Sequence, residues 1–176
     1  MQQSGVSRFT RFFAVLVVAV AVTGSALAHD FTVYRALTGK VNKTPCVTGP
    51  TTSPSEFRID PDGLSTFQAG VALLDTKAYR LRFGVQNAPH DPPVDGDQGT
   101  VANVNGFVYT ATYTPLLGGD GHWSLKNANR TDAEMKADFA AYAHAGGNVD
   151  RNPSYNTNNN PVYCPNAPMR ATFLKE

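Results

Sequence analysis

The sequence predicts an α+β fold, a single domain with a mainly antiparallel sheet, one helix over about 132–145 and a second over about 66–74. Several short runs either alternate apolar and polar side chains or are rich in β-branched and aromatic residues, and both patterns indicate strands. One segment combines a helix-start signal, an apolar stripe and a Gly-Gly stop, which indicates the first helix. A chain of 176 residues is expected to form one domain.

Five segments are expected to form strands. Residues 78–85 place apolar and polar side chains on opposite faces, and 106–115 is β-branched and aromatic throughout. After the turn LLGGDG, residues 122–125 resume as the hairpin partner of that segment. Shorter strands are expected at 31–37 and 169–174. The polar, Pro- and Gly-rich stretches between these segments, 38–63 and 87–100, are expected to be irregular.

The two predicted helices rest on similar start signals. Thr131 and Glu134 form a capping box, followed by an apolar stripe at Met135, Phe139 and Tyr142 and by the stop Gly146-Gly147. A second box, Ser65-Thr66-Phe67-Gln68, follows a turn at 60–63 and predicts the helix over 66–74.

The N-terminal region is typical of a signal peptide. Two arginines precede an apolar run at 12–22, and Ala26 and Ala28 supply the small residues at a cleavage site. The run is shorter than a membrane span, which needs roughly 20 residues. We therefore expect a signal peptide at 1–28 and a secreted or periplasmic globular domain at 29–176.

The charge of the exported part is close to zero. It keeps 13 of the 15 basic residues and all 14 acidic ones, so its formal net charge is −1. A nearly neutral chain has no long-range field to attract nucleic acid or anionic lipid. We expect no nucleic-acid partner, and no membrane association once the signal peptide is removed.

Both cysteines of the chain, Cys46 and Cys164, lie in the exported part. In an oxidising compartment two lone thiols most often pair, and neither residue lies in a CxxC motif or beside a histidine. The sequence therefore predicts a disulfide between them, rather than a nucleophile or a metal thiolate.

Two short motifs resemble the beginning of toxin-type ADP-ribosyltransferase domains: VYRALTG early in the chain and FRIDPDGLSTF after it. The resemblance covers residues 33–67 and implies an enzyme that uses NAD as its substrate. It implies that Arg35 holds an NAD phosphate, and that Ser65 and Thr66 support the nicotinamide side. The ExE or QxE pair of the family is absent, which leaves Glu134 as the candidate catalytic glutamate.

Histidines suggest two other kinds of site. A free N-terminal His29 offers two nitrogens to one copper ion, an arrangement that resembles the copper brace of exported copper proteins. His90, His122 and His144 are the candidate second ligands. Separately, His122 shares a strand face with Ser124 and Lys126, so it is also a candidate general acid or base.

A third possibility is a non-catalytic secreted module that binds a glycan or a protein partner. Tyr and Trp suit such surfaces because they combine a large apolar area with a polar end. The alternative for these aromatic residues is a place in the core. The residues concerned are Tyr109, Tyr113, Trp123 and Tyr155.

Overall fold

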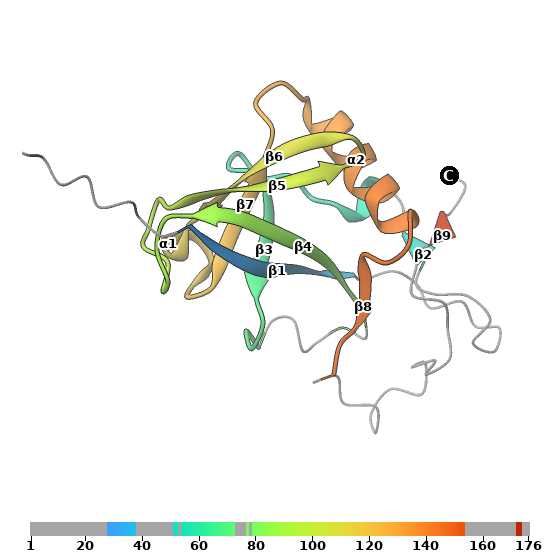
Figure 1. Ribbon diagram of the computed structural model, residues 1–176. Helices are drawn as coiled ribbons and strands as arrows, with labels where there is room; N and C mark the ends of the chain where they lie inside the picture. Colours follow the sequence, from blue (N-terminus) through green and yellow to red (C-terminus); the bar gives the residue numbers. More distant parts are fainter. Residues whose placement is uncertain are drawn as a thin grey trace, which may run out of the picture.

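Six antiparallel strands form a closed barrel in the order β1, β3, β7, β6, β5, β4, and β4 pairs with β1 to complete the ring (Figure 1). The computed structural model describes residues 28–37, 51–52, 54–72, 77, 79–153 and 172–173. The predicted antiparallel sheet is therefore confirmed, but the domain is sheet-dominated, with one main helix. The barrel strands are β1 His29–Leu37, β3 Leu64–Gln68, β4 Tyr79–Ala88, β5 Gln98–Val104, β6 Phe107–Tyr113 and β7 His122–Lys126.

The remaining elements lie around the barrel. The main helix, α2, spans Asp132–His144, and the short helix α1 spans Pro115–Gly118 between β6 and β7. The strand β8 (Val149–Arg151) extends the sheet along the first residues of β4. A 3-10 turn, η1, covers Pro54–Glu56, and β2 (Thr51–Thr52) pairs in parallel with β9 (Thr172–Phe173).

Long-range pairing of β1 closes the barrel. The strands β4 to β7 follow one another as an antiparallel meander, whereas β1 lies between β3 and β4. Val33 of β1 is opposite Phe83 of β4 on one side and opposite Gln68 of β3 on the other. Such pairings join residues far apart in sequence, so local patterns do not specify them.

Aromatic side chains form two groups of ring contacts in the core. Phe139 of α2 is fully buried and approaches three rings with centroid distances of 5.9, 5.7 and 4.9 Å, those of Phe57, Phe83 and Tyr109. Trp123 contacts Phe31 and Tyr113 at 5.8 and 5.2 Å. The burial of Phe139 among its three neighbouring rings therefore anchors α2 to the barrel.

The predicted helix over about 132–145 is confirmed together with its signals. Glu134 N donates to Thr131 Oγ1 at 3.3 Å, and Thr131 N donates to Glu134 Oε2 at 2.8 Å, which completes the capping box. Met135 and Phe139 are buried against the core. Gly146 and Gly147 follow with φ angles of 84° and 73°, a conformation that favours glycine.

The second predicted helix, over 66–74, is wrong. Residues 64–68 form β3, and Thr66, the first residue of the expected helix, instead donates its hydroxyl Oγ1 to the carbonyl of Trp123 at 2.9 Å. Thr66 and Phe67 are both buried, although they lie on opposite faces of the strand. A strand that is buried on both faces does not alternate polar and apolar residues, so its sequence lacks the usual strand pattern. The preceding turn is as predicted: Asp60 and Gly63 exchange two backbone hydrogen bonds, and Gly63 has a φ of 117°.

The prediction that 87–100 is irregular is also partly wrong, because β4 continues to Ala88 and β5 begins at Gln98. The hairpin between β6 and β7 is as predicted, with Thr112 opposite Ser124. The predicted signal peptide up to residue 27, and Cys46 and Cys164 with their disulfide, lie outside the described residues. Within the described part of the chain, no helix combines the length and apolar character of a membrane span.

Candidate functional site: an amide pocket between helix and barrel

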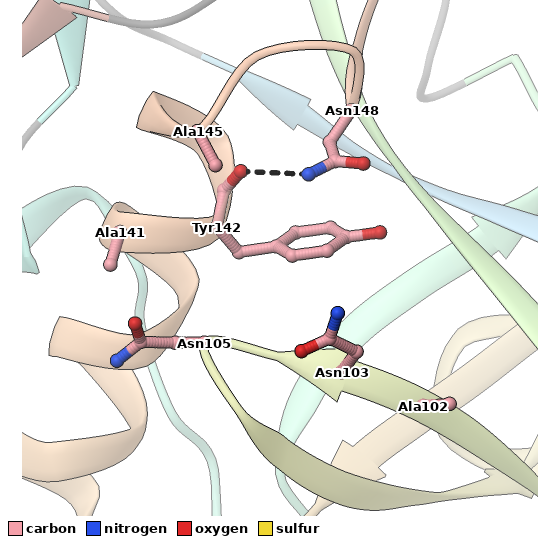
Figure 2. A pocket seen from close by; sticks show the side chains of 7 residues that line it. All are labelled: Ala102, Asn103, Asn105, Ala141, Tyr142, Ala145 and Asn148. Atoms are coloured by element: carbon pink, nitrogen blue, oxygen red, sulfur yellow. Dashed lines mark hydrogen bonds between the residues drawn. The ribbon is translucent and has the colours of Figure 1, made fainter.

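A pocket of about 340 Å³ lies where the second half of α2 meets the end of β5 (Figure 2). We call it the amide pocket, because three asparagine side chains line it together with a tyrosine and three alanines. Its lining residues are Ala102, Asn103, Asn105, Ala141, Tyr142, Ala145 and Asn148. Pockets of roughly 300 Å³ and above are the usual size class for small-molecule sites.

Backbone irregularity at the end of β5 forms the strand side of the pocket. The register between β5 and β6 shifts between Val101 and Val104, which leaves Asn103 in a bulge with a φ of 59°. Asn105 and Gly106 then form the hairpin turn, with φ angles of 52° and 86°. Asparagine tolerates this left-handed region better than most residues, and bulges commonly redirect side chains beside functional sites.

The helix side of the pocket is open because its residues are small. Ala141 of α2 and Ala145, the residue that caps its C-terminus, lie one turn apart and leave space between the helix and the strand. Tyr142 projects from the helix between the amides of Asn103 and Asn148 (Figure 2). Its ring stacks on Phe83 at 5.2 Å with an interplanar angle of 10°, which fixes its orientation.

Burial favours the neutral form of the Tyr142 hydroxyl. Burial raises the pKa of Tyr142, and the nearby positive charge of Arg82 only partly opposes that rise. A neutral phenol can both donate and accept a hydrogen bond. The pocket therefore presents, beside its amides, a hydroxyl group that can act as donor and as acceptor.

The three side-chain amides of the pocket differ in which of their atoms already make hydrogen bonds. Asn105 Nδ2 donates to Asp138 Oδ1 at 2.9 Å, and Asn148 Nδ2 donates to the carbonyl of Tyr142 at 3.0 Å. Their side-chain oxygens make no hydrogen bond to any described residue. Asn103 uses neither end of its amide within the described part of the chain. The residues that line the pocket thus keep two acceptor oxygens and one complete amide.

A buried carboxylate holds the strand side and the helix side together. Asp138 of α2 is 1% exposed and accepts from Asn105 at 2.9 Å, from Tyr109 Oη at 2.8 Å, and from Arg130 Nε and Nη2 at 3.0 Å each. We call these residues the Asp138 cluster. Burial and then the hydrogen bond to Asp138 raise the pKa of Tyr109. The cluster fixes Asn105, and with it the rim of the amide pocket.

Arg35 and Ser65, which the family resemblance assigns to an NAD pocket, are neighbours. Arg35 Nη1 donates to the Ser65 carbonyl at 3.1 Å across β1 and β3. Burial lowers the pKa of Arg35, whereas the negative charges of Glu56 and Asp60 raise it. Those two carboxylates already compensate the guanidinium charge that a phosphate would need.

Thr66 and Glu134, the other residues assigned to the NAD site, each make structural hydrogen bonds instead. Thr66 is fully buried and its hydroxyl bonds to the Trp123 carbonyl, so it faces the barrel interior. Glu134 accepts from both the amide and the hydroxyl of Thr131, at 2.8 and 2.9 Å. These hydrogen bonds lower the pKa of Glu134. Its carboxylate is therefore used in capping α2.

His122 is 3% exposed, which does not suit an acid or base that must reach a substrate. Its Nδ1 lies 3.0 Å from the Thr114 carbonyl and 2.8 Å from Thr114 Oγ1. Its ring also packs against Phe67 at 5.0 Å and leaves no room for a side chain at Gly118. The shared face with Ser124 is as predicted, since Trp123 and Leu125 are buried on the opposite face.

His29, the candidate copper ligand, begins β1 opposite Ala88. His90 follows two residues after Ala88 in the chain, beyond the end of β4. His90 Nδ1 contacts Asp97 at 2.9 Å. Burial raises the pKa of Asp97, but hydrogen bonds from Val94 and His90 outweigh it, and the pKa is lowered overall. No group of three or more His, Cys, Asp or Glu side chains within the described residues is arranged to hold a metal ion.

Three of the four aromatic residues considered for a binding face belong to the core. Tyr109 and Trp123 are fully buried, and Tyr113 is 8% exposed. Tyr155 lies outside the described residues. Tyr142, which sequence reasoning placed only in the apolar stripe of α2, is instead the aromatic residue of the amide pocket.

Comparisons with protein-family models, with curated proteins and with solved structures found no match for this chain. Sequence reasoning missed the amide pocket, although one local signal was present. The pair Asn105-Gly106 between two β-rich runs is a strong signal for a tight hairpin. It would have located the β5–β6 turn, although not the helix that packs beside it.

Proposed function

We propose that this protein is an exported binding module that recognises a small, neutral, polyhydroxylated ligand, such as a sugar unit of a glycan, in the amide pocket. The observation that carries the proposal is the set of amide groups around Tyr142 whose hydrogen-bonding capacity the fold leaves unused. Fixed polar groups in a concave, partly apolar pocket are typical of small-molecule sites.

The pocket can both donate hydrogen bonds to hydroxyl groups and accept hydrogen bonds from them. Each sugar hydroxyl donates one hydrogen bond and accepts others, and a planar amide offers an acceptor and a donor side by side. The oxygens of Asn105 and Asn148 accept, while Asn103 can do both. Tyr142 adds an aromatic surface for the apolar face of a sugar ring.

The charge of the pocket argues for a neutral ligand. No ionisable group other than Tyr142 lines it within the described residues. An ionised ligand would lose hydration there without an opposite charge in the lining, which is costly, because the nearby Arg82 is already paired with Asp150 at 3.4 Å. A neutral polyol meets no such penalty.

The test is ligand binding by a variant whose pocket is filled. Saturation-transfer NMR against a panel of mono- and disaccharides would identify a binder, and Ala141→Leu should abolish that binding. Leucine is a good helix former, so α2 itself should be retained. Ala137→Leu is the matched control, because Ala137 is exposed on the same helix and does not line the pocket.

The two variants separate the possible results. Loss of binding in Ala141→Leu with retention in Ala137→Leu would support the amide pocket. Equal binding by both variants, or no saturation transfer from any sugar of the panel, would contradict the proposal.

A second candidate function is an exported, toxin-like ADP-ribosyltransferase that uses NAD. The contact between Arg35 and Ser65 supports it, because the family resemblance assigns both residues to one pocket. Against it stand the acidic neighbours of Arg35 and the capping role of Glu134. Arg35→Ala should abolish NAD binding if this candidate is right, and unchanged affinity would exclude it.

Export and copper binding share one inexpensive measurement. Mass spectrometry of the natural product should give an N-terminus at His29 if the signal peptide is removed as proposed. Any residue before His29 removes the free amino group that a copper chelate needs. Titration of Cu(II) into the mature chain and into its His90→Ala variant would then test His90 as the second copper ligand. His90 follows shortly after Ala88, the residue that pairs with His29.

A further inference from the structure

A second concave site lies on the outer face of the barrel, over β5, β6 and β7. Its volume is about 290 Å³, and hydroxyl groups dominate its polar lining. We call it the hydroxyl groove. The residues that line it are Asp62, Gln98, Thr110, Thr112, Thr114, Ser124, Lys126 and Ala128.

Strand register aligns the groove. Gln98 of β5 is opposite Thr112 of β6, and Thr112 is opposite Ser124 of β7. Thr110 is opposite Lys126 in a neighbouring row. Because cross-strand partners point to the same face of a sheet, these side chains converge on one surface, carried by rigid strands.

A chain of hydrogen bonds connects the groove to His122. His122 Nδ1 lies 3.0 Å from the Thr114 carbonyl and 2.8 Å from Thr114 Oγ1, which in turn lies 3.0 Å from Ser124 Oγ. Ser124 is 4% exposed, and it lines the groove. Its hydroxyl has one proton and two lone pairs, so Ser124 Oγ can donate to a ligand in the groove when it accepts from Thr114 Oγ1.

Lys126 adds a positive charge beside this donor. It follows Ser124 by two residues on the same face, and its ammonium group donates one of its hydrogen bonds to the Pro61 carbonyl. An ammonium has three donors, so others remain. The donors of Ser124 and Lys126 suit a carboxylate oxygen.

Asp62 supplies the opposite charge in the same groove. A simple anion would gain from Lys126 but would be repelled by Asp62, and the reverse holds for a simple cation. A small molecule that carries both charges avoids either repulsion.

We propose that the hydroxyl groove binds a small zwitterion of the α-amino acid type, with its carboxylate at Ser124 and Lys126 and its ammonium group at Asp62. This site is separate from the amide pocket. It needs no sugar ligand, so it can hold or fail independently of the function proposed above.

The experiment is an NMR titration of the ¹⁵N-labelled protein with glycine and L-alanine, and with acetate and methylammonium as single-charge controls. The amino acids should shift the amide signals of Thr112, Ser124 and Lys126 and bind more tightly than either control. Ser124→Ala should weaken amino-acid binding about tenfold, the effect of losing one hydrogen bond to a charged group. Thr100→Ala, on the same outer face but outside the groove, should bind as the unmodified protein does.

A second variant keeps the test decisive if Ser124→Ala disturbs the sheet. Asp62→Asn changes an exposed turn residue and should remove the preference for amino acids over acetate. Absence of shifts at the groove throughout a millimolar titration would overturn the proposal. Equal binding of glycine and acetate by the unmodified protein would also overturn it, since Asp62 would then play no part.

Discussion

The helix α2 contacts the β5–β6 hairpin through two polar regions that differ in how completely their hydrogen bonds are used. In the Asp138 cluster, each carboxylate oxygen accepts two hydrogen bonds. In the amide pocket, one turn further along the helix, Asn103 has no partner among the described residues. Asn105 belongs to both regions, since its nitrogen donates to Asp138 and the residue also lines the pocket.

This difference separates polar groups that hold the fold from polar groups available to a ligand. A buried polar group without a partner is costly, so a structural cluster is expected to be saturated. A binding pocket must keep unused capacity, and it can do so at low cost only where water reaches it. Asp138 is 1% exposed, whereas Asn103 is exposed in its bulge. The comparison predicts that substitution in the Asp138 cluster lowers the unfolding free energy strongly. Substitution of Asn103 should change it little and should affect ligand binding instead.

The largest effect is expected from Asp138→Ala. Removal of the carboxylate leaves Arg130, the Tyr109 hydroxyl and the Asn105 amide without their shared acceptor. Breaking a buried ionic network of this kind costs about 3 kcal/mol or more. Urea denaturation should report this loss of unfolding free energy. A loss below about 1 kcal/mol would show that the cluster does not anchor α2.

An intermediate effect is expected from Thr131→Ala at the start of the same helix. The substitution removes the hydroxyl that accepts from Glu134 N, and loss of such a cap costs about 1 kcal/mol. Denaturation midpoints of Thr131→Ala and Thr131→Ser would measure it. Serine retains the hydroxyl, so an equal loss in both variants would contradict the capping explanation.

The same contrast explains which features could be predicted from the sequence. The capping box, the buried stripe and the Gly-Gly stop of α2 all lie within 17 consecutive residues, 131–147, and all were predicted. The barrel depends on β1 pairing with both β3 and β4, which no local pattern specifies. The segment Ser65–Gln68 carries a capping-box pattern, but burial of Thr66 and Phe67 on opposite faces makes it a strand.

The candidate sites were less accessible to sequence reasoning than the fold. The amide pocket joins a bulge, a hairpin turn and a helix face, and its asparagines occur in segments that are polar for several reasons. The family resemblance assigned Arg35 and Ser65 to one NAD pocket, and the structure shows only that Arg35 Nη1 donates to the Ser65 carbonyl across β1 and β3. The resemblance could not show that Glu56 and Asp60 share that neighbourhood.

A smaller effect is expected from acid, through Glu134. The hydrogen bond from the Thr131 amide, followed by that from its hydroxyl, lowers the pKa of Glu134 in the folded state. A lowered folded pKa means that the stabilisation is fully present above the unfolded value, about 4.3, and is lost as the pH falls through the folded value. In the unmodified protein, the unfolding free energy should therefore be higher at pH 6 than at a pH below the folded pKa of Glu134. This difference should be smaller in Glu134→Gln. Parallel pH profiles for variant and unmodified protein would contradict this.

The smallest effect on stability, and the sharpest test of the comparison, is expected from Asn103→Gly. Glycine adopts the positive φ of the bulge without strain, and the lost amide has no partner, so the unfolding free energy should change by less than about 0.5 kcal/mol. Asn103→Val should instead destabilise by about 1 kcal/mol or more, because a β-branched residue resists that conformation. Ligand binding should respond differently, since both variants remove the amide that faces the pocket. A stable Asn103→Gly variant that has lost sugar binding would therefore show that this residue is retained for recognition. A large loss of stability in Asn103→Gly would place Asn103 with the Asp138 cluster instead.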